Sequence, residues 1–256
     1  MKPYALFQNI KFAVFAYWDL RKIRKTRKRI HQYKAAGQYD LEREQIGILQ
    51  DTWGTSLIEH IGAEVNIVGR ENIPEEPVVI VANHQGYGDI PILTQIMKHR
   101  QFGCVAKEEL EKVPVFNDII LDVRSVYIRR DDARASLRAI ETGIEYLKQG
   151  FSMAIFPEGT RSHGPQMGEF KRGSLRLATK PGVPVVPVTI SGSYKCFEEQ
   201  GYVRPDRVDV YIHPPIETKN MDRREAAGLA ETVEEIVRTK LLEMQEEEAK
   251  REGKQR

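Results

Sequence analysis

A histidine and an aspartate follow a run of β-branched residues in the segment VVIVANHQGYGD, residues 78–89. Gly86 and Gly88 lie between His84 and Asp89, and they indicate a turn. An imidazole can accept a proton at neutral pH, and a carboxylate on its other nitrogen would fix the tautomer and stabilise the cation. Such a pair could activate a hydroxyl group. The segment alone leaves open the alternative that Asp89 caps a helix while His84 bonds to a backbone carbonyl.

A second polar turn follows another apolar run, in FSMAIFPEGTRS at residues 151–162. Gly159 lets the backbone approach a ligand, Thr160 offers a hydroxyl and an amide, and Arg161 can bind a phosphate through its planar guanidinium. Open α/β sheets bind their ligands at the carboxyl ends of strands, so we expect both turns at one edge of a sheet. Together they predict a phosphate-bearing nucleophile beside a base.

The elements that must position these turns alternate between apolar runs and helical patterns. Helices are expected at 90–99, 131–149, 170–180 and 222–245. Strands are expected at 64–69, 78–83, 102–107, 125–130, 151–157, 183–190 and 207–215. The alternation predicts an α/β fold with a mixed, largely parallel sheet flanked by helices.

Two amphipathic helices are expected before the first strand. The first carries apolar residues at helical spacing, namely Leu6, Phe7, Ile10, Val14, Tyr17 and Trp18, and the basic block RKIRKTRKRIHQYK follows it directly at 21–34. The second carries Ile46, Leu49, Trp53, Leu57 and Ile61. We therefore divide the chain into a membrane-associating segment at 1–62, an α/β domain at 63–245 and a charged tail at 246–256, whose last residues we expect to be frayed.

Composition and the two cysteines limit the class of protein to which the chain can belong. The chain has 256 residues, of which 41% are hydrophobic and 30% charged, and this suits one folded domain with an appendage. Cys104 and Cys196 form no CxxC pair and accompany no secretory signal pattern, which favours a reducing cytoplasm. The apolar stretch at 4–18 is shorter than the roughly 20 residues of a membrane span, and Lys11 interrupts it.

Other catalytic patterns are missing from the sequence. The nearest match to a serine nucleophile elbow, GFSMA at 150–154, enters a strand instead of leaving one. The remaining histidines show no spacing typical of a metal site, so no metal is expected. We expect Cys104 to lie in the core and Cys196 to lie in a loop that could be exposed.

The two turns resemble motifs of one enzyme family. NHQGYGD is similar to the His-x4-Asp motif, and FPEGTRS to the Glu-Gly-Thr-Arg motif, of the glycerolipid acyltransferases, which include the 1-acylglycerol-3-phosphate O-acyltransferases. SVYIRR at 125–130 resembles the arginine-bearing strand between them, VPVVPVTI at 183–190 resembles the fourth motif, and AKEELEKVPVFN at 106–117 resembles a phosphate-binding segment. The resemblance spans residues 65 to 215, with the motifs in family order. Gly86 departs from the serine often found in the first motif.

The resemblance implies transfer of a fatty acyl group from a thioester, on acyl carrier protein or coenzyme A, to the free hydroxyl of 1-acyl-sn-glycerol 3-phosphate, giving phosphatidic acid. His84 would be the general base and Asp89 its orienting partner, and no cofactor is needed. Oxyanion donors are expected among the backbone amides near Gly159. The implied substrate-binding residues are Lys107, Arg129, Arg130, Glu158, Gly159, Thr160 and Arg161; Arg130 matches the family arginine better, since Arg129 stands where an aspartate is often found.

Three further interpretations stay open at this point. The acceptor could be another lysophospholipid or glycerol 3-phosphate, or the chain could be an inactive membrane-surface or polyanion-binding protein, although the intact motifs speak against inactivity.

The aromatic helix and the basic block predict a peripheral or monotopic protein on the cytoplasmic face of a membrane. The alternative is a solvated basic helix packed on the domain. The expected partners are membrane lipids, lysophosphatidic acid and acyl carrier protein or acyl-CoA, with no nucleic acid.

Overall fold

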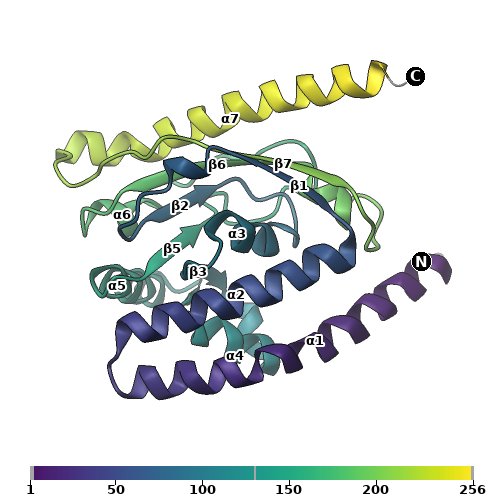
Figure 1. The fold of residues 1–256 in the computed structure, drawn as a ribbon. Coiled ribbons are helices and arrows are strands. Elements are labelled where there is room, and N and C mark those ends of the chain that lie inside the picture. Colours follow the sequence, from purple (N-terminus) through teal and green to yellow (C-terminus); the bar gives the residue numbers. More distant parts are fainter. Residues whose placement is uncertain (1–2, 130, 255–256) are drawn as a thin grey trace.

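A computed structural model describes residues 3–129 and 131–254 of the chain. These residues contain a 7-stranded sheet in the order β1-β7-β6-β2-β5-β3-β4 (Figure 1). Neighbouring strands are parallel, except that β6 and β7 are antiparallel. The strands are β1 (Glu64–Val68), β2 (Val79–Ala82), β3 (Phe102–Lys107), β4 (Val126–Ile128), β5 (Ser152–Ile155), β6 (Val185–Ser191) and β7 (Arg207–Ile212).

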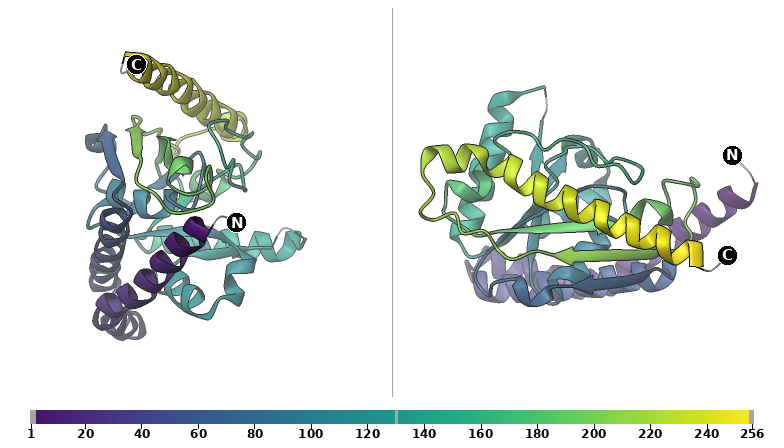
Figure 2. Two further views of the ribbon diagram at one scale, coloured as in Figure 1. Left: turned by 90° about the vertical axis from the view of Figure 1, so that its right-hand side faces the viewer. Right: turned by 90° about the horizontal axis from the view of Figure 1, so that it is seen from above.

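Helices cover both faces of this sheet. They are α1 (Pro3–Ala35), α2 (Tyr39–Ile61), α3 (Asp89–Met97), α4 (Pro114–Asp122), α5 (Ala133–Lys148), α6 (Arg176–Thr179) and α7 (Arg223–Lys254), with the short 3-10 helices η1 (Arg70–Asn72), η2 (Glu108–Lys112) and η3 (Ser193–Cys196). One face packs against α2 and α3, and the other packs against α5, α6 and α7. Figure 1 shows α7 on the opposite side of the molecule from α1 and α2, and Figure 2 shows α7 running across the sheet.

The unbroken apolar run before His84 is a strand buried on both faces. Ile80 and Ala82 of β2 pack in the cluster that contains α3, whereas Val79 and Val81 pack in the cluster that contains α5 and α7. Successive side chains of a strand point to opposite faces, so a central strand covered by helices on both sides needs an apolar residue at every position. The predicted mixed, largely parallel sheet with flanking helices is confirmed.

The N-terminal helices form a third cluster against the end of the sheet. Ile23 and Ile30 of α1 are buried with Ile46 and Leu49 of α2 and with Phe151, which precedes β5. The inward positions of α1 are therefore part of the core even within the basic block. Across the described residues, no helix combines the length and apolar character that a membrane crossing needs.

Some helix boundaries differ from the sequence predictions. Helix α1 has 33 residues and includes the basic block, which was expected to follow a shorter helix. Helix α4 was not predicted, and the helix expected at 170–180 is only α6. Helix α7 continues to Lys254, beyond the end expected at 245, and the last residues of the tail, 255–256, lie outside the described residues. The three-part division of the chain stays a prediction.

Candidate active site

The two polar turns lie side by side because their strands are neighbours. Strand β2 pairs in parallel with β5, with Val81 opposite Ile155, so the chain leaves both strands at the same edge of the sheet. His84 follows β2 and Glu158 follows β5. On its other side β2 pairs in parallel with β6, which brings the segment after Ser191 to the same edge. The carboxyl edge of three central strands thus carries the candidate site, as expected for an open α/β sheet.

His84 and Asp89 form the contact that their spacing suggested. The imidazole Nδ1 lies 2.6 Å from Asp89 Oδ2, and the same oxygen accepts the backbone N–H groups of Gln85 at 2.7 Å and Gly86 at 3.0 Å. The Asp89 side chain is fully buried, whereas that of His84 is 17% exposed. A carboxylate that accepts from Nδ1–H leaves the lone pair on Nε2 as the basic site. The alternative in which His84 bonds to a backbone carbonyl is not the arrangement found.

Three residues that support this pair were missed in the sequence. Ser193, at the start of η3, donates its hydroxyl to Asp89 Oδ1. Phe156 stacks on the imidazole with a centroid distance of 4.1 Å and an interplanar angle of 17°. Asn83 joins β2 to β6 through two hydrogen bonds of 2.8 Å with the backbone of Ile190. Only Phe156 and Asn83, the first residues of FPEGTRS and NHQGYGD, could have been suspected from their positions.

Glu158 connects the two turns. Its Oε1 accepts the backbone N–H of His84 at 2.6 Å, and its Oε2 accepts that of Gly168 at 2.7 Å. Burial raises the pKa of the Glu158 carboxyl, although the two backbone hydrogen bonds act in the opposite direction. These contacts join the Glu158 turn to the His84 turn and to the segment at Gly168, while binding of an acceptor by Glu158 stays a prediction.

Backbone hydrogen bonds also join the turns directly. The N–H of Ser162 donates to the carbonyl of His84 at 2.8 Å, and the N–H of His163 donates to the carbonyl of Gln85 at 3.1 Å. These bonds do not depend on which side chains the turns carry. We call the two bonds and the Glu158 contacts the loop staples.

Arg161 lies next to the histidine turn and has two partners there. Its Nη1 lies 3.0 Å from Oε1 of Glu198, and its guanidinium carbon lies 3.6 Å from the centre of the Tyr87 ring. Gly159 has a positive φ of 68°, which favours glycine, and its N–H donates to the carbonyl of Phe156 at 3.0 Å. That amide is therefore used within the turn. Thr160 is exposed beside it.

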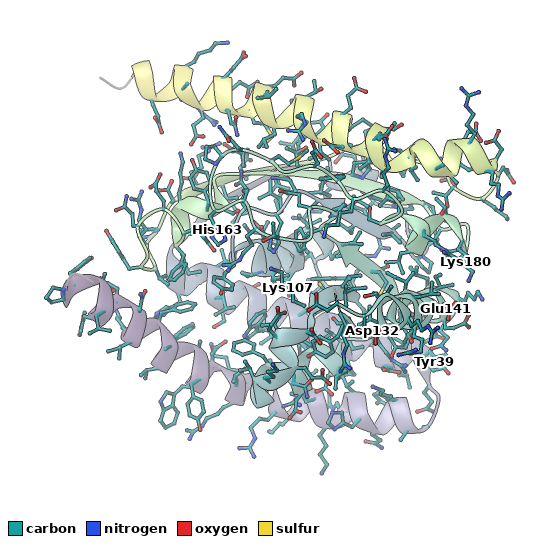
Figure 3. All side chains as sticks on the ribbon, turned by 180° about the vertical axis from the view of Figure 1, so that it is seen from behind. Tyr39, Lys107, Asp132, Glu141, His163 and Lys180 are labelled. Carbon is teal, nitrogen blue, oxygen red and sulfur yellow. The ribbon has the colours of Figure 1, made fainter. Side chains whose placement is uncertain are left out.

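The remaining predicted phosphate-binding residues lie at neighbouring strands. Lys107 ends β3, which is parallel to β5, so this lysine reaches the same edge of the sheet (Figure 3). Arg129 follows β4 and forms ion pairs with Glu108 at 3.3 Å and Glu111 at 3.2 Å. Arg130 lies outside the described residues. A role of these residues in substrate binding stays a prediction.

The cysteines lie outside this set of contacts. Cys196 is buried, so the expectation that it could be exposed was wrong. Burial raises the pKa of each thiol, Cys104 and Cys196, to about 12. A thiol with such a pKa is protonated at neutral pH and is a poor nucleophile.

Comparisons with known proteins agree with this geometry. A family model described as acyltransferase matches residues 64–191. The 1-acyl-sn-glycerol-3-phosphate acyltransferase of Pseudomonas aeruginosa is 33% identical over 195 residues, which cover 72% of this chain and 74% of the relative. A chloroplastic enzyme of the same name from Arabidopsis thaliana is 35% identical over 163 residues, covering 62% of this chain. The alignment spans only 45% of that plant protein, so this chain covers about half the length of its chloroplastic relative.

A solved structure extends the similarity to nearly the whole chain. The crystal structure of PlsC, the 1-acyl-sn-glycerophosphate (LPA) acyltransferase from Thermotoga maritima, superposes with a TM-score of 0.73 at 29% identity and covers 94% of this chain and 98% of the other. Since the match covers 94% of this chain, it includes most of the N-terminal helices as well as the sheet. With its ordered motifs, its sheet and these relatives, the chain belongs to the glycerolipid acyltransferase family.

Proposed function

We propose that the protein transfers a fatty acyl group from acyl carrier protein or coenzyme A to the free hydroxyl of 1-acyl-sn-glycerol 3-phosphate, giving phosphatidic acid. The observation that carries the proposal is the His84–Asp89 pair stapled beside the turn that bears Arg161. The names of the relatives from Pseudomonas aeruginosa and Thermotoga maritima support the same acceptor.

His84 is the proposed general base. Its Nδ1–H is held by Asp89, so Nε2 removes the proton from the acceptor hydroxyl as that oxygen attacks the thioester carbonyl. The new C–O bond forms, the C–S bond breaks, and the departing thiolate receives the proton from the imidazolium. Asp89 stabilises the transient positive charge on the ring. No bound cofactor takes part in this scheme, because the thioester already activates the acyl group.

Arg161 is the proposed main contact of the acceptor phosphate. A guanidinium has five N–H donors, and the contact with Glu198 engages only Nη1. Lys107 at the end of β3 is the second proposed cation, because it lies on the strand next to β5. Arg129, Arg130, Glu158, Gly159 and Thr160 complete the proposed binding set.

Acylation of a panel of acceptors tests the proposed reaction. The full chain in mixed micelles with acyl carrier protein or coenzyme A thioesters should convert lysophosphatidate to phosphatidate, measured with a labelled acyl chain. Arg161→Gln is expected to raise the KM for lysophosphatidate about tenfold, since hydrogen bonds to charged groups contribute roughly 1.5–3 kcal/mol.

Arg172→Gln is the matched control, because Arg172 is 86% exposed and pairs with Glu231. It should leave KM unchanged. Acylation of glycerol 3-phosphate or another lysophospholipid in preference to lysophosphatidate would refute the proposed acceptor. Failure to acylate any acceptor would refute the proposed reaction.

We also infer that α1 lies on the cytoplasmic face of a membrane as a peripheral or monotopic anchor. Apolar side chains on its outer side are exposed, including Phe7 at 64%, Tyr17 at 65% and Trp18 at 51%. Lys25 lies seven residues after Trp18, and Lys28 lies seven residues after Arg21. Seven residues are about two helical turns, so both lysines continue the same side of α1. An aromatic row with cations beside it suits the headgroup layer of an anionic membrane.

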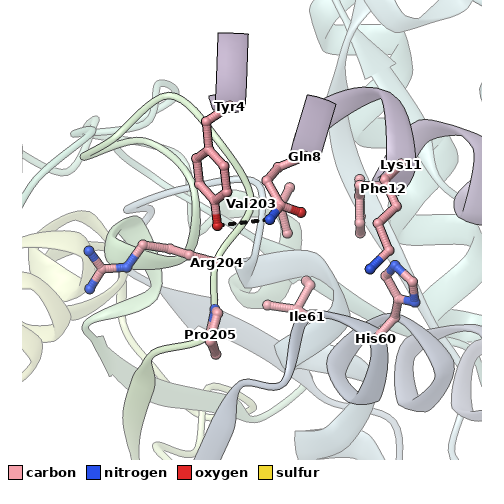
Figure 4. Close-up of a pocket in the computed structure, with 9 residues that line it drawn as sticks. All are labelled: Tyr4, Gln8, Lys11, Phe12, His60, Ile61, Val203, Arg204 and Pro205. Atoms are coloured by element: carbon pink, nitrogen blue, oxygen red, sulfur yellow. Dashed lines mark hydrogen bonds between the residues drawn. The ribbon is translucent and has the colours of Figure 1, made fainter. Parts of the chain in front are cut away.

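The opposite side of α1 is occupied by the protein itself. Asn9 donates to the carbonyl of Gly201 at 2.9 Å and accepts the N–H of Val203 at 3.2 Å. A pocket of about 140 Å³ lies there between α1, the end of α2 and the segment around Arg204 (Figure 4). The body thus fixes the rotation of α1 and leaves the aromatic row facing outwards.

Charge removal on α1 tests the anchor without disturbing the core. Lys25→Gln with Lys28→Gln should weaken binding to vesicles that contain phosphatidylglycerol by about 2 kcal/mol, since each cation near an anionic surface contributes about 1 kcal/mol. The measurement is co-sedimentation with vesicles. Arg223→Gln with Arg224→Gln is the control, because both arginines are exposed on α7, on the far side of the molecule (Figure 1). Equal sedimentation of the two double variants would refute the anchor.

A further inference from the structure

Glu198 is a buried carboxylate at the proposed acceptor site that no family motif contains. It lies two residues after η3, and its side chain is only 2% exposed. Its Oε1 accepts from Arg161 Nη1 at 3.0 Å and from the backbone N–H of Tyr87 at 2.8 Å. Its Oε2 is buried and has no hydrogen-bond partner among the described residues. The residue therefore contacts both turns of the site with one oxygen and leaves the other unused.

The same carboxylate explains the unusual glycine in the first motif. A Cβ atom added to Gly86 would lie 2.3 Å from Oε2 and 2.7 Å from the carboxyl carbon of Glu198. Such a contact is far shorter than atoms tolerate, so any side chain at this position would have to displace the carboxylate. Gly86, where a serine is often found, and Glu198 are thus two parts of one arrangement.

The segment 197–198 also fixes the surroundings of Arg161. Tyr87, whose ring lies under the guanidinium, contacts Phe197 edge-on at 5.9 Å. The guanidinium is held at one end by the Glu198 carboxylate and on one face by Tyr87, and its side chain is 20% exposed. Its other N–H donors can still meet an anion that enters from solvent.

We propose that Glu198 is a specificity-determining residue, an internal counter-ion of Arg161 with which the phosphate of the acceptor must compete. This inference rests on the proposed function, in which Arg161 binds that phosphate. A buried carboxylate beside the phosphate repels it, and the repulsion grows with the charge of the phosphate. A phosphomonoester carries up to about two negative charges and a phosphodiester one, so Glu198 weakens the binding of lysophosphatidate more than that of a lysophosphodiester.

The competition acts on the product as well as on the acceptor. Phosphatidate keeps the same phosphomonoester, so the product meets the same repulsion. When the product leaves, Glu198 neutralises Arg161 again in place of the phosphate. A buried cation without a partner would be costly, and the carboxylate removes that cost in the empty site.

Equilibrium binding without a thioester donor tests the inference. Calorimetry with a soluble short-chain lysophosphatidate should show a Kd about tenfold lower for Glu198→Gln than for the unmodified chain, because a nearby like charge has been removed. The amide keeps an oxygen for the Tyr87 N–H and the Arg161 contact. The gain should be smaller for lysophosphatidylglycerol of the same chain length and absent for monoacylglycerol.

Glu199→Gln is the matched control, since it removes the same charge from the adjacent residue. Glu199 is 39% exposed and lies 3.8 Å from Arg204 instead of Arg161, so the Kd should change less than about twofold. Gly86→Ala is a second, independent variant, because its Cβ displaces the Glu198 carboxylate. It should also lower the Kd for lysophosphatidate. Thermal melting checks that each variant is folded. If Glu198→Gln does not fold, the Kd of Gly86→Ala tests the inference in its place.

An unchanged or higher Kd in the folded variants would overturn the inference and make Glu198 a residue that positions Arg161 for phosphate. The measurement separates this result from failure of the proposed function, because binding needs no acyl transfer. A chain that binds lysophosphatidate but acylates nothing would refute the proposed reaction, while the Kd shift would still decide the role of Glu198. Lack of binding by every form would overturn both.

Discussion

Replacement of His84 by alanine is expected to lower the kcat of acyl transfer by about 10²–10⁴-fold, the usual contribution of a general base. The KM for lysophosphatidate should change little, because the proposed phosphate contacts of Arg161 lie on the other turn. Phe156 loses the ring on which it stacks, but the loop staples use only the backbone of His84, so the two turns should stay joined. Steady-state rates with a labelled acyl donor measure both constants.

His163→Ala is the matched control for this experiment. His163 is exposed in the loop after Arg161 and takes part in the staples only through its backbone N–H. Its replacement should leave kcat within about twofold, since the change removes only an exposed side chain and keeps the backbone N–H that forms the staple. Asp89→Asn should lower kcat as well, because a neutral amide cannot stabilise the imidazolium. A His84→Ala protein that keeps more than a third of the normal kcat would refute general-base catalysis by this residue.

Loss of the carboxylate of Glu42 is expected to reduce the free energy of unfolding by about 3–5 kcal/mol, the cost of leaving a buried charge without its partner. Glu42 of α2 is fully buried and binds Arg124 through two hydrogen bonds of 2.7 Å. Burial is the largest single effect and lowers the pKa of Arg124, but the hydrogen bond and the charge of Glu42 together with smaller contributions from Tyr146 outweigh it, so the pKa is raised. Urea unfolding of Glu42→Gln measures the loss.

Two further variants make this stability test specific. The double variant Glu42→Gln with Arg124→Met should be more stable than Glu42→Gln alone, because it removes the unpaired cation together with its partner. Glu145→Gln breaks an exposed ion pair with Lys148 and should cost at most about 1 kcal/mol. A loss below about 1 kcal/mol for Glu42→Gln would mean that this pair does not hold α2 to the domain.

The elements that were predicted well are those whose cause is local. The apolar run at 78–82 indicated a strand covered on both faces, and in the structure every residue of β2 is buried. Helix α4 was missed because its first residues, 114–117, fall within AKEELEKVPVFN, which was interpreted only as a phosphate-binding segment. Helix α1 was expected to be shorter because Ile23 and Ile30 stand among the cations of the basic block and were not recognised as core residues. Their burial depends on contacts with α2.

The same limit applies to the candidate site. The contact between His84 and Asp89 could be suggested from sequence because one short turn joins them. The contact between Arg161 and Glu198 could not, because the two residues are 37 positions apart with β6 between them, and their approach depends on the order of strands in the sheet. Gly86 was the only local sign of it, as a residue that departs from the common motif.

The loop staples hold His84, the proposed base, beside the second turn before any substrate arrives. Closure around the acceptor is not needed to bring His84 to the second turn, because backbone hydrogen bonds already join them. A base that is always in place would also activate water, and water would then hydrolyse the acyl thioester without acylating the acceptor. On the proposed bilayer surface, lipid around the site would exclude water, and hydrolysis of the thioester would then be limited by that exclusion instead of by assembly of the site.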